Sequence, residues 1–346
     1  MPVIRPRRRV QRFLLLISAG GLICLILKLR RPSKVLPWMN EGQDAGVKLS
    51  VGGSSYYYFS NTGKAANQST ADPSGLCPLP ILTGAEWKYS LNHSMAELER
   101  TFGSQMRQGG RWGPSDCQAR SKIALVLPFM DRWDNLADFL HFMIPFLQRQ
   151  QLDFRFVLAE QLAVPQQDGI VFFNKGKLMN AAFELLSASG ASTDAVDCVV
   201  FHDVDLLPMT DGPLYGHCAS PLHLGAYVDR LNFELSFDYM VGGAISYSPT
   251  DFRKVNGFST EYWGWGGEDE DMGKRTLKSG LVIHRFDNVP SNRYTMLSHK
   301  RRGSNALNGK IIRRLIRSSE SRWTWEGLSS RNWRVVNRTE ERFFTI

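Results

Sequence analysis

The feature that most constrains the fold is a regular alternation of strand-like and helix-like segments between residues 122 and 205. Short apolar runs predict buried strands, at 123–129, 154–161 and 197–205. Helical spacing of apolar residues predicts helices over 136–150 and 176–189, the first kinked or broken by Pro145. This alternation predicts an α/β fold with a mostly parallel central sheet and helices on both faces.

An acidic pair follows the third predicted strand. Ligands of parallel sheets bind beyond the carboxyl ends of the strands, so residues 128–132, Gln161 and 203–205 are expected on one rim. Asp203 and Asp205 would share a face, because residues two apart on a strand point the same way. Such carboxylates repel each other unless a cation compensates, and their hard oxygens suit Mg²⁺ or Mn²⁺.

An Asp-x-Asp pair alone is weak support for a metal site, because about one is expected by chance in such a chain. Its position after a buried strand favours two enzyme classes. In nucleotide-sugar transferases the metal bridges a carboxylate and the diphosphate, whereas in aspartyl phosphatases the first Asp is the nucleophile. The second class requires a small residue where this chain has Leu207, which favours the first.

A second cluster, residues 262–271, reads YWGWGGEDED. Its three glycines allow the backbone to bend, and Trp263 and Trp265 offer flat apolar faces for a sugar ring. The four carboxylates of residues 268–271 raise one another's pKa, so one of them can act as a general base. The same acidic row is also suited to the start of a helix.

The N-terminal region carries the whole net charge of +9. Residues 1–34 contain nine Lys or Arg and no acid, and the remaining 33 bases are matched by 33 acids. The body therefore lacks a basic surface for nucleic acid. The apolar run 13–27, flanked by bases and followed by KLRRPSK instead of a cleavage site, predicts an uncleaved signal anchor. The expected parts are a cytoplasmic tail (1–12), a transmembrane anchor (13–29), a flexible stem (30–76) and a lumenal catalytic domain (77–346).

A lumenal body would be glycosylated and oxidised. Acceptor sequons occur at Asn67, Asn92 and Asn337. Cys24 lies in the expected membrane span, which leaves four cysteines, enough for two disulfides in any of three pairings. The chain has no CxxC or HxxxH spacing, so the sequence predicts no zinc site.

Four segments, in this order, resemble the β-1,4-galactosyltransferase family. They are FNKGKLMN (173–180), FHDVDLLP (201–208), YWGWGGEDED (262–271) and MLSH (296–299). The resemblance runs from about Cys77 to Leu328. It implies the single-domain nucleotide-sugar transferase fold called GT-A, on a single-pass type II protein of the Golgi membrane. It also implies Mn²⁺-dependent, inverting transfer of galactose from UDP-galactose to the 4-hydroxyl of a terminal N-acetylglucosamine.

The resemblance also assigns roles to individual residues. Glu268 and Asp269 would bind the acceptor, with Asp269 as the general base, and Asp205, Met296 and His299 would ligate Mn²⁺. The nucleotide-sugar positions would be Pro128, Phe129, Arg132, Phe173, Lys175, Asp203, Val204, Gly243 and Trp265, of which Lys175 is commonly Arg in the family. The Trp265 loop and residues 300–317 would close over the donor. The implied disulfides are Cys77–Cys117 and Cys198–Cys218.

Three alternatives remain open. Met240 stands where the family often has Tyr, which makes room for the acetamido group of UDP-N-acetylgalactosamine as donor. A xylose acceptor in the proteoglycan linker is the second alternative, although WGWGGED and MLSH resemble the N-acetylglucosamine group more closely. A non-catalytic lumenal glycan-binding protein is the third, and the complete set of metal ligands argues against it. Ile311, Ile312 and Leu315 could form an acetyl pocket or simply the core face of a helix.

Overall fold

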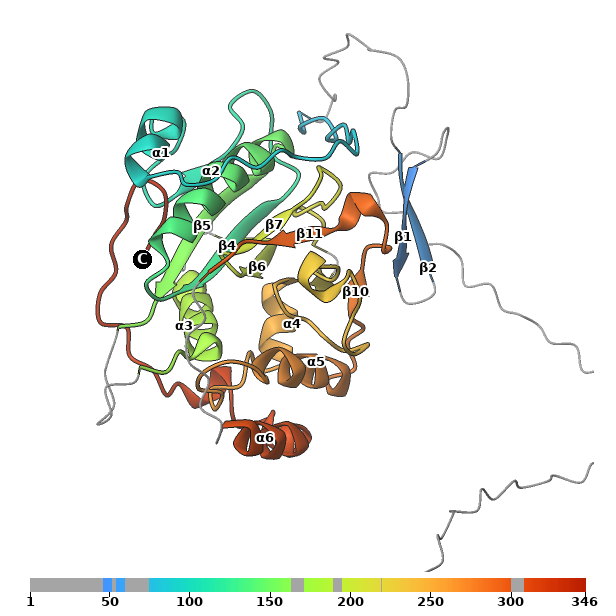
Figure 1. Ribbon diagram of the computed structural model, residues 1–346, viewed down its shortest axis with the longest axis vertical. Coiled ribbons are helices and arrows are strands. Elements are labelled where there is room, and N and C mark those ends of the chain that lie inside the picture. The colour runs from blue at the N-terminus through green and yellow to red at the C-terminus, as the bar shows by residue number, and fades with distance from the viewer. Residues whose placement is uncertain are drawn as a thin grey trace, which may run out of the picture. The chain divides into compact units, whose positions relative to one another are not determined.

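The computed structural model describes residues 46–51, 54–59, 75–162, 171–188, 195–218, 220–299 and 308–346 (Figure 1). The chain divides into Met1–Pro32, none of which is described, and Ser33–Ile346, which holds all of the described residues. No helix within the described residues has the length and apolar character needed to cross a bilayer. The predicted anchor at 13–29, most of the stem and Asn67 lie outside the described residues.

The described strands are β1 (Gly46–Val51), β2 (Ser54–Phe59), β3 (Arg111–Trp112), β4 (Lys122–Phe129), β5 (Asp153–Glu160), β6 (Cys198–His202), β7 (Leu206–Pro208), β8 (Leu222–His223), β9 (Ala244–Tyr247), β10 (His284–Arg285) and β11 (Tyr294–Met296). The helices are α1 (Met95–Phe102), α2 (Trp133–Arg149), α3 (Lys175–Ala188), α4 (Pro249–Lys254), α5 (Glu268–Lys278) and α6 (Asn308–Arg322). The three predicted strands correspond to β4, β5 and β6, and the two predicted helices correspond to α2 and α3.

The central sheet has seven strands in the order β10-β8-β9-β6-β4-β5-β3. The pairs β6–β4, β4–β5 and β10–β8 are parallel, whereas β8–β9, β9–β6 and β3–β5 are antiparallel. The sheet is therefore mixed, and the prediction that it is mostly parallel is wrong for its antiparallel strands. The parallel centre consists of the three strands of the alternating segment, and the antiparallel neighbours come from parts of the chain without that alternation. Separate two-stranded sheets are formed by β11 with β7 and by β1 with β2.

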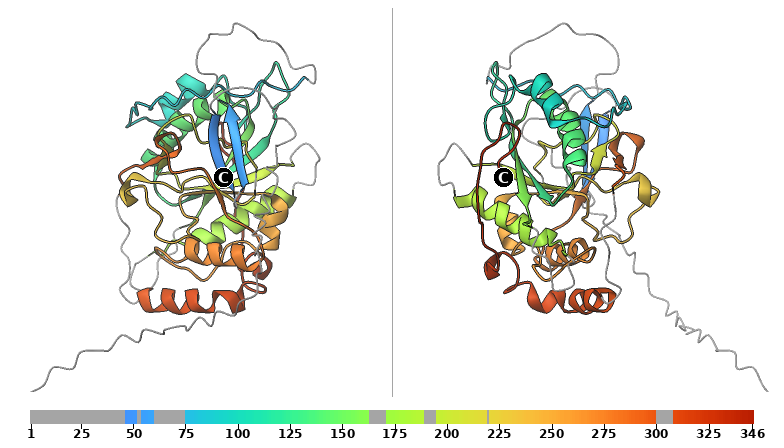
Figure 2. Two further views of the ribbon diagram at one scale, coloured as in Figure 1. Left: turned by 90° about the vertical axis from the view of Figure 1, so that its right-hand side faces the viewer. Right: turned by 60° about the vertical axis from the view of Figure 1, so that its left-hand side comes forward.

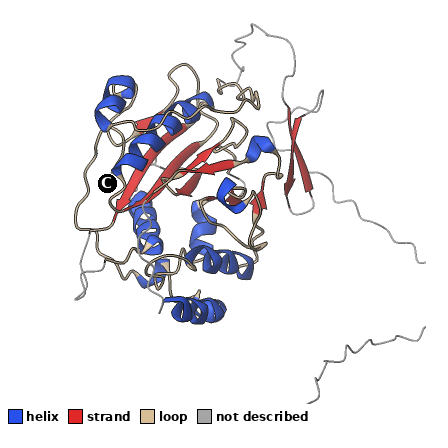
Figure 3. Cartoon of the chain, in the orientation of Figure 1, coloured by secondary structure: helices blue, strands red, loops and turns tan. Residues whose placement is uncertain are grey.

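Helices cover both faces of the sheet, as predicted (Figure 3). Successive residues of a strand point to opposite faces. Leu125 of β4 belongs to the same apolar cluster as Phe139 of α2, whereas the next residue, Val126, clusters with Phe183 of α3. The two helices therefore lie on opposite sides of the sheet.

The helix α2 runs without interruption from Trp133 to Arg149 and contains Pro145. The predicted helix is confirmed, but Pro145 does not break it. A proline inside a helix costs about 3 kcal/mol. Burying one large apolar side chain contributes about 1.5–3 kcal/mol, and α2 buries several against the sheet, among them Phe139, Met143 and Phe146. Packing on the sheet therefore outweighs the local cost.

Candidate active site

The strand β6 ends at His202, so the predicted strand 197–205 is too long. Asp203 and Asp205 lie on the turn that joins β6 to β7, and the argument that they share a strand face does not hold. The turn is fixed from both sides. A hydrogen bond joins Nε2 of buried His202 to Tyr215 Oη (2.7 Å), and the Asp203 amide donates to the Gly243 carbonyl (2.8 Å).

The first residue of α3, Lys175, is placed by its buried neighbour Asn174. The Asn174 Oδ1 accepts a hydrogen bond from the Lys177 amide (2.9 Å), which caps the helix. The Asn174 Nδ2 donates to the Thr260 carbonyl (2.8 Å). One side chain therefore ties the start of α3 to the segment that leads into residues 262–267, the Trp265 loop. Sequence reasoning missed Asn174, although it stands next to Lys175 within FNKGKLMN.

The Lys175 ammonium lies among three carboxylates. Its Nζ is 3.0 Å from Asp203 Oδ1, 3.2 Å from Asp269 Oδ1 and 3.8 Å from Glu268 Oε1. Burial by itself lowers the pKa of Lys175, but Asp203, Asp269 and Glu268 outweigh it and raise the pKa well above its ordinary value. The lysine is therefore a permanent cation that holds the carboxylates of Asp203 and Asp269 together.

Glu268 and Asp269 begin α5, in the positively polarised first turn of a helix. Burial, followed by the charge of Asp269, raises the pKa of Glu268 to about 7. Burial also raises the pKa of Asp269, while Lys175 acts in the opposite direction. The Glu268 Oε2 is buried and has no hydrogen-bond partner among the described residues. Both carboxylates therefore bind a proton more readily than a carboxylate in water does.

The other two acids of the row face elsewhere. Glu270 pairs with Lys274 Nζ (3.4 Å) and accepts from Tyr239 Oη (3.1 Å). Asp271 is fully buried between two guanidinium groups, Arg275 Nε at 2.5 Å and Arg322 Nη2 at 3.0 Å. Only the first two acids of the predicted row thus share one environment.

A buried network extends from Asp271 to the C-terminal helix. Arg275 and Arg322 both contact Glu326 Oε2, at 2.5 and 2.6 Å. Glu326 in turn accepts from the Thr260 amide (2.6 Å), and Tyr262 Oη donates to Asp271 (2.8 Å). Figures 1 and 2 show α6 running beside α5, and these contacts join the two helices. Sequence reasoning missed this network, because its members are too far apart in the chain to form a motif.

Asp205 has a different set of partners. Its Oδ2 lies 2.9 Å from both Arg132 Nη1 and His299 Nε2. Its carbonyl accepts from the Leu297 amide (2.7 Å), and in the β11–β7 ladder Met296 lies opposite Leu206. The turn after β6 and the segment after β11 are therefore joined here. This brings together the three residues predicted as metal ligands, Asp205, Met296 and His299.

The chemistry of this set fits a divalent cation. Asp205 is 5% exposed, and burial, followed by the neighbouring charge of Asp203, raises its pKa. Its Oδ2 lies 2.9 Å from His299 Nε2, so one ion could contact both groups. Carboxylate, imidazole and thioether together favour Mn²⁺ over Mg²⁺, because two of the three are softer than oxygen.

The Trp265 loop lies beside the start of α3. The Gly264 amide donates to the Phe173 carbonyl (2.8 Å), and the Lys177 Nζ lies 4.7 Å from the ring centroid of Trp263. Gly266 and Gly267 have φ of +95° and +99°, a left-handed conformation that a residue with a side chain rarely adopts. Trp265 is 83% exposed, so its face is free to meet a ligand.

The segment that contains Met240 is held by its backbone. Arg285 Nη2 donates to the Met240 carbonyl (2.7 Å), and His223 Nε2 meets the Gly242 carbonyl (2.8 Å). A Cβ on Gly242 would lie 2.7 Å from Asp269 Oδ2, so this segment borders the candidate base. The Met240 side chain is half-buried and does not carry these contacts.

Two of the predicted nucleotide positions are core residues. Phe129 and Val204 are 1% and 3% exposed and belong to the apolar cluster with α2. Neither side chain is therefore exposed to a ligand. Pro128 is likewise buried within β4, opposite Ala159.

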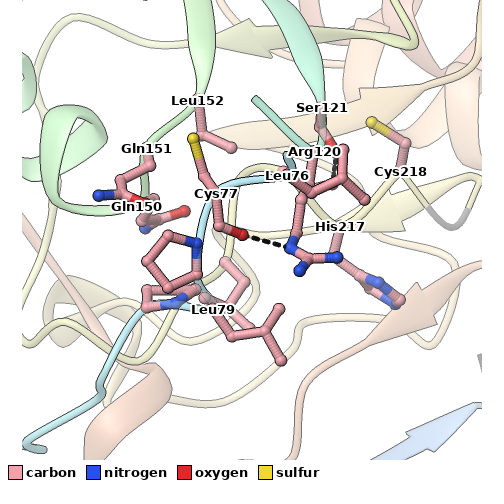
Figure 4. Close-up of a pocket in the computed structure, with 14 residues that line it drawn as sticks. Leu76, Cys77, Leu79, Arg120, Ser121, Gln150, Gln151, Leu152, His217 and Cys218 are labelled. Carbon is pink, nitrogen blue, oxygen red and sulfur yellow. Dashed lines mark hydrogen bonds between the residues drawn. The ribbon is translucent and has the colours of Figure 1, made fainter. Parts of the chain in front are cut away.

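Both disulfides implied by the resemblance are present, Cys77–Cys117 and Cys198–Cys218. A pocket of about 420 Å³ lies between them, and in it Arg120 Nε donates to the Cys77 carbonyl (2.6 Å; Figure 4). Ser121 and Leu152 line this pocket and immediately precede β4 and β5. It therefore lies at the opposite end of the strands from Asp203 and Asp205.

Two family descriptions match most of the described chain. Residues 78–219 match the N-terminal region of glycosyl transferase group 7, and residues 222–300 match the N-terminal domain of galactosyltransferase. A crystal structure of a Drosophila β-1,4-galactosyltransferase 7 variant, in complex with manganese, UDP-Gal and xylobiose, is 27% identical. The comparison has a TM-score of 0.53 and covers 65% of this chain and 91% of that one.

Curated relatives are closer in sequence. Rat β-1,4-galactosyltransferase 6 is 35% identical over 75% of this chain and 66% of its own length. The human β-1,4-galactosyltransferase 6 is 34% identical over 80% of this chain and 70% of its own length. The matches to the first three curated relatives span 57–66% of those proteins. With both family descriptions matched and a GT-A-like mixed α/β fold, the chain belongs to the β-1,4-galactosyltransferase family.

Proposed function

We propose that the chain is an inverting hexosyltransferase that moves galactose from UDP-galactose to the 4-hydroxyl of a terminal N-acetylglucosamine. The observation that carries this proposal is the position of Lys175, within 3.2 Å of both Asp203 and Asp269. It places the carboxylate assigned to the donor beside the carboxylate assigned to the acceptor. A direct transfer requires this proximity.

In the proposed reaction, Asp269 accepts the proton of the acceptor hydroxyl as that oxygen attacks the anomeric carbon. The bond from that carbon to the diphosphate breaks, and UDP leaves with the bonding electrons, so a single displacement inverts the configuration. Glu268 orients the acceptor, and the exposed Trp265 stacks on the sugar. Bound Mn²⁺, held by Asp205, Met296 and His299, would neutralise the charge of the diphosphate.

Closure of the site over the donor is part of the proposal. The Trp265 loop contains consecutive glycines, which permit backbone rotation. Residues 300–307 of the second proposed closing segment, 300–317, lie outside the described residues, and the rest belong to α6. Ile312 approaches the loop, because a Cβ on Gly267 would lie 2.9 Å from Ile312 Cγ2. Ile311, in contrast, is 55% exposed.

A second donor, UDP-N-acetylgalactosamine, is favoured by the Met240 side chain. It is half-buried and is not held by the contacts that fix its backbone, so it can move aside for an acetamido group. For the acceptor, the alternative to N-acetylglucosamine is xylose. The solved relative with xylobiose supports it, whereas the WGWGGED and MLSH segments favour N-acetylglucosamine.

The cellular setting is proposed on the N-terminal sequence. The apolar run with basic flanks supports a single-pass type II anchor at 13–29 in the Golgi membrane, with the tail at 1–12 in the cytoplasm, a stem at 30–76 and the catalytic domain at 77–346 in the lumen. Two disulfides agree with an oxidising compartment. Asn92 and Asn337 are exposed and therefore accessible to glycosylation, which we propose also for Asn67.

The test uses the 346-residue chain purified with its disulfides intact. It receives Mn²⁺, an N-acetylglucosamine acceptor, and UDP-galactose or UDP-N-acetylgalactosamine in parallel. We expect galactose transfer that is lost in Asp269→Asn and on chelation of the metal. Glu270→Gln is the matched control, because Glu270 is the next but differently paired carboxylate.

The outcomes separate the alternatives. Faster transfer of N-acetylgalactosamine would replace the proposed donor. Transfer only to xylose would replace the acceptor. Failure of all transfer together with failure of Mn²⁺-dependent UDP binding would leave a non-catalytic glycan-binding protein and overturn the proposal.

A further inference from the structure

A group of metal-binding side chains lies outside the proposed active site, where α1 meets α2. His93 immediately precedes the N-cap of α1, Glu97 lies in the first turn of α1, and His141 lies in α2. One ligand atom from each lies within 4.8 Å of the other two. Two imidazoles and one carboxylate are typical ligands of zinc and related transition metals.

A fourth side chain, Asp138, fixes the orientation of His93. The Asp138 Oδ1 lies 3.0 Å from His93 Nδ1 and accepts from the His93 amide at 2.9 Å. The side chains of His93 and Asp138 are only 6% and 10% exposed, so this contact is shielded from water. A carboxylate at Nδ1 holds the proton there and leaves Nε2 as the lone pair that can bind a metal. Carboxylate–histidine–metal arrangements in proteins have this form.

We infer that His93, Glu97 and His141 form a second metal site, specific for Zn²⁺ or a similar borderline divalent ion, with Asp138 as its orienting partner. The rings of His93 and His141 are stacked with centroids 3.6 Å apart. The lone pair of each ring nitrogen lies in the plane of its ring, so one imidazole has to turn out of the stack before both nitrogens face one ion, and the three ligand atoms, now within 4.8 Å of one another, would then approach the spacing of about 3.4 Å between tetrahedral ligands of Zn²⁺. The ion would pin α1 to α2 and have an open position for water.

The sequence did not reveal this site because its ligands come from two separate segments. His93 and Glu97 are four residues apart, and Asp138 and His141 are three apart on one face of α2. Neither pair has the CxxC or HxxxH spacing typical of zinc sites. The site is distinct from the Asp205 centre, because His141 is nine residues along α2 from Arg132, or about 13 Å.

The experiment titrates Zn²⁺ into the 346-residue chain that has been saturated with Mn²⁺ and UDP, which fill the proposed active site. Calorimetry gives the stoichiometry, and the melting temperature reports stabilisation by the bound ion. We expect one further equivalent of Zn²⁺ and a higher melting temperature. Co²⁺ in place of Zn²⁺ should give the visible absorption of a low-coordinate, nitrogen-ligated ion.

Variants identify the ligands. His141→Ala should abolish the additional equivalent, Glu97→Gln should weaken it at least tenfold, and Asp138→Asn should weaken it 10- to 100-fold. Glu99→Gln is the control, because Glu99 is an exposed acid on another face of the same helix. If His141→Ala does not fold, Glu97→Gln provides the test instead, because Glu97 is a partly exposed residue of α1. Absence of a further equivalent, or zinc binding that is unchanged in Glu97→Gln, would overturn the inference.

Discussion

The ammonium group of Lys175 lies 3.2 Å from the carboxylate of Asp269, the group proposed to remove the acceptor proton. A cation at this distance stabilises the ionised carboxylate and so lowers the pKa that burial raises. The same ammonium contacts Asp203 at 3.0 Å. Lys175 therefore adjusts the basicity of Asp269 and also holds the two halves of the site together.

The first prediction concerns this pair. Lys175→Met should raise the pKa of Asp269, because the charge that opposes the effect of burial is lost, so the acidic limb of the kcat/KM profile should move to higher pH. Lys175→Arg should restore most of the activity, because the positive charge is kept. Profiles of the two variants and the parent over pH 5–9 measure the shift. An uncharged variant with an unmoved acidic limb would show that Lys175 does not act on the base.

The second prediction concerns Glu268, whose pKa is about 7 in the folded chain and has an ordinary value of 4.5. Between these pH values the folded chain holds a proton that the unfolded chain has released. Stability therefore falls as pH rises from 4.5 to 7 and stays reduced above 7. Glu268→Gln removes this cost, so its gain in free energy of unfolding should be larger at pH 8 than at pH 5, by up to about 3 kcal/mol.

Urea unfolding of Glu268→Gln and the parent at the two pH values is the measurement. A pH-independent difference between the two proteins would mean that Glu268 titrates near its ordinary pKa in the folded state.

The third prediction concerns the proposed metal ligands. Met296→Leu keeps the volume of the side chain but removes the thioether sulfur. We expect the preference for Mn²⁺ over Mg²⁺ to fall, since the softest ligand is lost. His299→Ala should weaken binding of both ions, because it removes a ligand of either. Metal-dependent UDP binding, measured for each ion, distinguishes these effects, and an unchanged preference in Met296→Leu would remove Met296 from the ligand set.

The fourth prediction concerns the buried ion network. Asp271→Asn removes one of the two carboxylates that face Arg275 and Arg322, so the two buried guanidinium groups share Glu326 alone among the described residues. Breaking a buried pair in this way typically costs about 3–5 kcal/mol. Glu270→Gln, at the partly exposed neighbouring position, should cost less than about 0.5 kcal/mol. Denaturant unfolding of both variants gives the comparison, and similar small losses would indicate that water reaches the network.

The fifth prediction concerns donor choice. Met240→Tyr places a larger, stiffer ring beside the segment that borders Asp269. Transfer of N-acetylgalactosamine should fall more than transfer of galactose, because the acetamido group needs the space. The ratio of kcat/KM for the two donors is the measurement. Equal losses for the two would mean that Met240 does not contact the donor.

The sequence by itself determined the alternating centre of the fold. Apolar runs of strand length and helices between them were sufficient for β4, α2, β5, α3 and β6, because their hydrophobic patterns are local and strong. The resemblance located the candidate site through short contiguous segments. Lys175, Asp203 and Asp269 were chosen from three of these segments, and the structure brings them together around one ammonium.

Only the tertiary structure decided the contacts between distant segments. The antiparallel strands β3 and β9 and the end of β6 at His202 depend on pairing partners far away in the chain. The separation of Asp271 from Glu268 depends on Arg322, 51 residues later, and the cluster of His93 and His141 depends on the packing of α1 on α2. Local sequence patterns do not carry this information, because burial and charge pairing are set by residues that meet only when the chain has folded.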